Sequence, residues 1–187
     1  QNLLAMQREL AASYARRLTP EDLHLVVQQE LLKFLWLDGH LAGRTYDVLM
    51  TSLPIAELQR RLDIAGELHP ESKTLGDCRA DPELAAAETE ALLNARRLYT
   101  PHSDIASIAP EKSVLLEWTI PTVSKRERPT NKRPRVVFPA TTVGRKGCYE
   151  LREALKGINA ELVILGPQIE DKDFWAGFDL VQGNADW

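Results

Sequence analysis

Residues 135–167 read RVVFPATTVGRKGCYELREALKGINAELVILGP, and this stretch decides the fold class. The apolar run at 135–140 predicts a strand, the Leu and Ala spacing at 148–155 predicts a helix, and the run at 160–167 predicts a second strand. A strand, short loop, helix and strand within about 30 residues form a βαβ unit. Its strands should be parallel and joined by a right-handed crossover. The sequence therefore predicts an α/β protein.

The sequence before this unit alternates predicted helices and strands in the same way. Apolar periodicity predicts the helices and short β-rich runs predict the strands. The expected helices are at 3–18, 28–37, 55–62 and 83–95, and the expected strands at 22–27, 46–51, 98–100 and 113–118. We therefore expect two Rossmann-like lobes, each a parallel sheet flanked by helices, with the second lobe incomplete.

A basic, proline-containing segment at 121–134 separates the two predicted lobes. It sets five Lys and Arg residues against one Glu, with Arg135 directly after it, and contains three prolines. Such a composition is typical of an interdomain linker. A nucleic-acid or phospholipid patch is the alternative, and the lack of interleaved aromatic residues favours the linker. The predicted domains are therefore 1–120, the linker 121–134, and 135–187.

Composition excludes several classes of protein. The 187 residues are 44% apolar and 27% charged, which is close to the average for globular proteins. The net charge of −4 argues against a dedicated nucleic-acid binder. Cys78 and Cys148 form no CxxC pair, so we expect no metal site and a reducing cytoplasm. No apolar run approaches the ~18–20 residues of a membrane span.

The loop at 141–147 is the one stretch whose residues together suggest a binding site for an anion. It leads from the carboxyl end of a predicted strand into a helix N-terminus, where ligands of open α/β sheets bind. The cations of Arg145 and Lys146, the backbone of Gly144 and Gly147 and the hydroxyl of Thr142 together suit a diphosphate. The loop matches neither the P-loop nor the GxGxxG pattern. An ordinary βα turn with surface cations is the alternative.

This stretch resembles the second domain of GT-B glycosyltransferases, in particular the retaining family 4. In that family a strand, a Gly-Arg dipeptide, a short loop, Lys-Gly and a helix follow one another. Here 136–140 is similar to the strand, Lys146-Gly147 to the Lys-Gly, and 148–155 to the helix. The chain departs from the pattern because Gly144-Arg145 directly adjoins Lys146, and two threonines stand where Gly-Arg is expected.

The resemblance implies transfer of a sugar from a nucleotide-diphosphate-sugar donor to an unknown acceptor. Lys146 and Arg145 would bind the donor diphosphate, with Gly144, Gly147 and Thr142 beside them. The implied reaction is a retaining hexosyl transfer in which the nucleotide sugar is a substrate and neither a cofactor nor a metal takes part. The resemblance assigns no catalytic residue within the sequence. A non-catalytic nucleotide- or phosphate-binding module, or an interaction domain, is the alternative.

The remaining expectations concern two histidines, the first helix and the two ends of the sequence. His40 and His102 are candidate acceptor-side residues of the first lobe. The helix near the start should pack on that lobe, with contact to a membrane surface as the alternative. Gln1 and Trp187 both look like cut ends, since a two-lobed fold needs roughly twice this length. We therefore expect a fragment that is inactive by itself.

Overall fold

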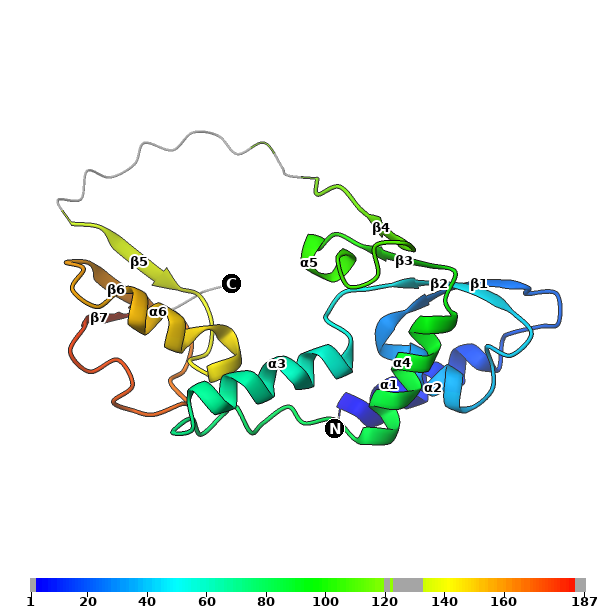
Figure 1. Ribbon diagram of the computed structural model, residues 1–187, viewed down its shortest axis with the longest axis horizontal. Coiled ribbons are helices and arrows are strands. Elements are labelled where there is room, and N and C mark those ends of the chain that lie inside the picture. Colours follow the sequence, from blue (N-terminus) through cyan, green and yellow to red (C-terminus); the bar gives the residue numbers. More distant parts are fainter. Residues whose placement is uncertain (1–2, 120–121, 123–132, 184–187) are drawn as a thin grey trace. The chain divides into compact units, whose positions relative to one another are not determined.

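The computed structural model describes residues 3–119, 122 and 133–183 (Figure 1). Within these residues the protein is α/β, with two parallel sheets flanked by helices. The predicted fold class, a Rossmann-like α/β protein, is confirmed. Most of the predicted linker at 121–134 lies outside the described residues.

The chain divides into two compact units. The first comprises Gln1–Gln59 and Ala80–Pro121, and the second comprises Arg60–Arg79 and Thr122–Trp187. The second unit thus takes in a segment from the range 1–120, which was expected to form the first domain. Each unit has its own sheet and its own buried core.

The first unit is built on a four-stranded sheet in which every neighbouring pair is parallel. The strands follow one another in the order β1 (His24–Gln28), β2 (Thr45–Leu49), β3 (Arg97–Thr100) and β4 (Ser113–Leu115). Because the order runs in one direction, right-handed crossovers carry the connecting helices to the same face. Burial agrees with this, since Val27 and Val48 are buried whereas Val26 and Leu49, which point to the other face, are exposed.

Helices cover one face of this sheet (Figure 1). They are α1 (Leu3–Ala15), α2 (Gln29–Leu37) and α4 (Pro82–Asn94), whereas the single turn α5 (Ser103–Ala106) directly follows β3. The N-terminus of α4 is fixed locally, because the Asp81 carboxylate accepts a hydrogen bond from the Glu83 N–H at 2.8 Å and Pro82 occupies the first turn. The core between helices and sheet includes Leu32 and Ala91, both fully buried.

The second unit contains the βαβ arrangement that the sequence predicted. Its parallel strands β5 (Arg135–Phe138), β6 (Glu161–Ile164) and β7 (Asp179–Gln182) lie in that order. The 3₁₀ turn η1 (Gly144–Lys146) and the helix α6 (Cys148–Ala154) connect β5 to β6. The core of this unit is aromatic, with Trp175 buried against Phe138, Phe174 and Phe178.

Several elements differ from the prediction. Helix α3 (Ile55–Leu68) continues six residues past the expected end at 62, because no Pro or Gly interrupts it before Gly66. Strand β7 was not predicted. The strands expected at 22–27 and 135–140 form the edge strands β1 and β5, in which only Val27 and Phe138 are buried.

The aromatic cluster at 174–178 forms turns that bury Phe174 and Trp175. Trp118 of the first unit is 64% exposed. Of the helices in the described part of the chain, none has the length and apolar character that crossing a membrane would require.

Candidate functional site

The candidate site is the loop between β5 and α6 in the second unit. The chain leaves β5 at Phe138, closes the turn η1 and enters α6 after Gly147, whose φ of +77° is in the left-handed region that favours glycine. Two hydrogen bonds close the turn, from the Lys146 N–H to the Val143 carbonyl at 3.0 Å and from the Gly147 N–H to the Gly144 carbonyl at 3.1 Å. The loop therefore has a defined conformation.

Four of the five predicted diphosphate-binding residues fall into two groups, and Gly147, the fifth, is partly exposed. Arg145 and Lys146 are adjacent and exposed on η1. Thr142 and Gly144 are buried and already have partners within the protein. The Thr142 hydroxyl accepts a hydrogen bond from the Trp175 indole N–H at 3.1 Å, and its carbonyl accepts one from the Glu170 N–H at 2.9 Å. The two cations are therefore the predicted side chains that face solvent.

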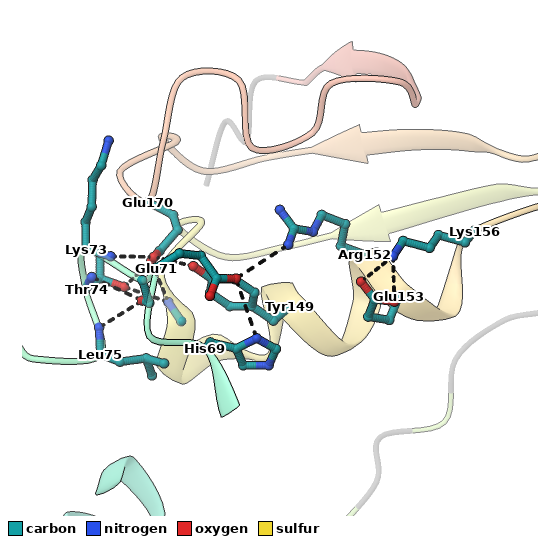
Figure 2. A network of polar contacts seen from close by, with 12 residues as sticks. His69, Glu71, Lys73, Thr74, Leu75, Tyr149, Arg152, Glu153, Lys156 and Glu170 are labelled. Atoms are coloured by element: carbon teal, nitrogen blue, oxygen red, sulfur yellow. Dashed lines mark hydrogen bonds and ion pairs between the residues drawn. The ribbon is translucent and has the colours of Figure 1, made fainter. Parts of the chain in front are cut away.

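A buried carboxylate lies against this loop. The side chain of Glu170, a residue that is 2% exposed, accepts hydrogen bonds from the Gly144 N–H at 3.1 Å, the Lys73 N–H at 2.8 Å and the Tyr149 hydroxyl at 2.7 Å (Figure 2). The Thr74 hydroxyl also donates to it. The loop that was predicted to bind an anion thus holds the carboxylate of its own chain.

The hydrogen bonds determine the charge state of this carboxylate. Burial by itself would raise the pKa of Glu170, but donors from Ser72, Thr74, Tyr149 and Lys73 outweigh it and lower the pKa to about 2. The same contacts act on Tyr149, whose pKa rises to about 12 because the hydroxyl is buried and donates to a carboxylate. Glu170 is therefore ionised at neutral pH.

The Lys73 and Thr74 donors to Glu170 come from a segment far away in the sequence. Residues 72–75 follow α3 and lie against the β5–α6 loop within the second unit (Figure 2). The Ser72 hydroxyl accepts hydrogen bonds from the N–H groups of Thr74 and Leu75, which closes a tight turn. The buried Leu75 side chain lies so close to Gly144 that an added Cβ would be 2.6 Å from its Cγ. A glycine is needed at this position because of that approach.

A ring of aromatic and charged side chains surrounds this network. The His69 ring stacks on Tyr149 at 4.1 Å between centroids, and the Arg152 guanidinium lies 4.4 Å from the centre of the Phe174 ring. Glu71 lies between the His69 ring and the Arg152 guanidinium, at 3.8 Å and 4.0 Å (Figure 2). Of these side chains, Glu71, Tyr149, Arg152 and Phe174 border a hollow of about 280 Å³.

The two candidate acceptor-side histidines belong to the first unit and do not lie together. His40 follows α2 and precedes β2, which places it at the amino edge of the sheet. His102 follows β3 at the opposite, carboxyl edge, where its ring lies against that of Trp118. The structure therefore does not combine them into one site.

Sequence reasoning did not find two buried carboxylates that the structure shows to be hydrogen-bonded. Besides Glu170, Asp47 on β2 is 3% exposed and is bound by Arg96 through two hydrogen bonds of 2.9 and 2.7 Å. The His24 ring approaches the same carboxylate at 3.3 Å. The Arg96 hydrogen bonds lower the pKa of Asp47 despite its burial. An acid between hydrophobic residues of a predicted strand, Tyr46 and Val48, was the available signal.

Neither a metal site nor a known relative emerges from further comparison. Among the residues that the structure describes, no group of three or more His, Cys, Asp or Glu side chains could hold a metal ion. Searches of protein-family models, of curated proteins and of solved structures find no match to this chain.

Proposed function

We propose that the β5–α6 loop binds the diphosphate of a nucleotide sugar, and that the chain is part of a glycosyltransferase. The observation that carries this proposal is the pair of exposed cations, Arg145 and Lys146, on a turn at the carboxyl edge of a parallel sheet. Ligands of open α/β sheets bind at that edge. The resemblance of 136–166 to family 4 glycosyltransferases supports the same assignment.

The structure refines how such a ligand would be held. The N–H groups of Gly144, Lys146 and Gly147 already donate to acceptors within the protein. The phosphate oxygens would therefore contact the Arg145 guanidinium and the Lys146 ammonium. Negative charge grows on a departing diphosphate, so two positioned cations stabilise the transition state more than the ground state. The reaction proposed is a hexosyl transfer to an unidentified acceptor, in the reducing cytoplasm.

The second candidate is a nucleotide- or phosphate-binding module without catalytic activity. The N–H groups of the loop already donate within the protein, so an anion would bind only to exposed side chains. This favours a module that binds without catalysis. Such a module would bind the donor and would transfer no sugar. Transfer from a radiolabelled nucleotide sugar to any acceptor, or to water, would distinguish the two functions.

Calorimetric titration with UDP-glucose, GDP-mannose and ADP-glucose tests the proposal. We expect one nucleotide series to bind, and we expect Lys146→Ala and Arg145→Ala each to weaken binding about tenfold or more, because each removes a charged hydrogen bond. Lys172→Ala is the matched control, since Lys172 is an exposed cation of the same unit. Equal affinity of Lys146→Ala and the unchanged chain would contradict the proposal.

A further inference from the structure

The first unit has an exposed tryptophan, Trp118, beside a hollow at the carboxyl edge of its sheet. This side chain is 64% exposed, although tryptophan is among the most apolar residues of the chain. It lies beyond the end of β4, next to the turn that follows β3. With Pro101, Ser103, Leu115, Leu116 and Glu117 it borders an open hollow of about 630 Å³. That volume is within the range of small-molecule sites.

The exposed indole is held in place by the turn after β3. Its N–H donates to the Pro101 carbonyl at 2.8 Å, which satisfies the polar end of the side chain. The His102 ring meets it edge-on, at 5.5 Å between centroids and 70° between ring planes. The turn itself is fixed by a hydrogen bond from the His102 N–H to the Thr100 hydroxyl at 3.2 Å. The ring is therefore oriented while most of its surface remains open to solvent.

Polar groups lie around this apolar surface. Ser103 supplies an exposed hydroxyl and Glu117 an exposed carboxylate, while Leu115 and Leu116 add apolar area. The combination of a flat aromatic face with hydrogen-bonding groups at its margin matches the chemistry of a sugar ring. A pyranose presents C–H groups on one face, which pack on an aromatic ring, and hydroxyls around its edge.

We propose that this hollow binds a saccharide, with Trp118 as the stacking surface and His102 as the residue that orients it. The Ser103 hydroxyl then donates or accepts a hydrogen bond, and the Glu117 carboxylate accepts hydrogen bonds from the sugar hydroxyls. This proposal concerns only the first unit. It holds whether or not Arg145 and Lys146 of the second unit bind a nucleotide sugar, so either proposal can fail alone.

The test is a titration of the chain with maltotriose, cellotriose and chitotriose, in which saturation-transfer difference NMR measures binding. We expect saturable binding of at least one trisaccharide. Trp118→Leu should weaken it about tenfold, because the aromatic face is lost, whereas Trp118→Phe should weaken it less than about threefold. Leu93→Ala is the matched control, since Leu93 is a 71% exposed apolar residue of the same unit.

Three results would overturn the proposal. The first is the absence of saturable binding for all three trisaccharides. The second is an unchanged affinity in Trp118→Leu, provided that its circular dichroism spectrum shows a folded chain. The third is self-association of the unchanged chain in sedimentation that Trp118→Leu abolishes without any saccharide binding, which would assign the surface to protein contact.

Discussion

The Glu170 carboxylate accepts a hydrogen bond from the Gly144 N–H at 3.1 Å, which joins the segment after β6 to the loop before α6. The same carboxylate binds the Lys73 N–H of the segment after α3. Three stretches of chain that are separate in the sequence thus meet at one buried negative charge. A buried carboxylate with several donors stabilises a fold only while it remains ionised.

Replacement of Glu170 by glutamine should therefore destabilise the second unit in a pH-dependent way. The folded pKa of about 2 lies below the value of about 4.3 expected in an unfolded chain. A lowered pKa gives stability that is fully present above the unfolded value and is lost as the pH falls toward the folded value. At pH 7 we expect Glu170→Gln to lower the free energy of unfolding by about 3 kcal/mol.

Urea denaturation at pH 7 and pH 3, followed by near-ultraviolet circular dichroism, measures this effect. The difference between Glu170→Gln and the unchanged chain should shrink at pH 3. Glu150→Gln is the control, because Glu150 is an exposed acid on α6 of the same unit. A difference that is the same at both pH values would show that the ionised carboxylate is not what stabilises the unit.

The approach of Leu75 to Gly144 leads to a second prediction. In Gly144→Ala the new methyl group would lie 2.6 Å from the Leu75 Cγ, so the leucine must shift. We expect a loss of about 1–3 kcal/mol in the free energy of unfolding, as for other overpacked cores. Leu75→Ala removes the clash, so the double variant should be less destabilised than the sum of the two single variants. Strict additivity in the double-mutant cycle would contradict this account.

Helices and strands that are determined by residues close together in the sequence could be predicted. Strand β5, helix α6 and strand β6 lie within 30 residues, and their apolar spacing sufficed to place them. Strand β7 has four residues, all exposed, so no alternation or burial pattern marked it. The loop between β5 and α6 was found for its cations and glycines, whose chemistry is visible residue by residue.

Contacts between distant residues were not predictable in the same way. Thr74 and Glu170 are 96 positions apart, and Asp47 and Arg96 are 49 positions apart. Nothing in the composition around Glu170 shows that its carboxylate turns inward and takes the Gly144 N–H. The sequence analysis expected the backbone of Gly144 to contact a bound diphosphate. In the structure the Gly144 N–H instead donates to the Glu170 carboxylate.

The Asp47–Arg96 ion pair leads to a third prediction. Arg96→Ala leaves a carboxylate that is 3% exposed without its two main hydrogen bonds. We expect the free energy of unfolding of the first unit to fall at pH 7, because the buried Asp47 carboxylate loses its two Arg96 donors. Arg97→Ala, at the neighbouring exposed position, is the control and should have little effect. Urea denaturation followed by circular dichroism would detect the difference, and equal effects of the two substitutions would refute the assignment.

The two cysteines should differ sharply in reactivity. Cys148 is buried at the start of α6, and burial raises the pKa of its thiol to about 12, with the nearby Glu170 charge acting in the same direction. The thiolate is the reactive form, so at pH 8 only roughly one Cys148 in 10⁴ could react. Cys78 is exposed on the segment after α3. We expect iodoacetamide to add one label to the native chain, at Cys78, and two labels in urea, as measured by mass spectrometry of tryptic peptides. Rapid native labelling of Cys148 would mean that the Tyr149–Glu170 side of the core opens to solvent, and Cys148→Ser, which should leave native labelling unchanged, identifies the labelled residue.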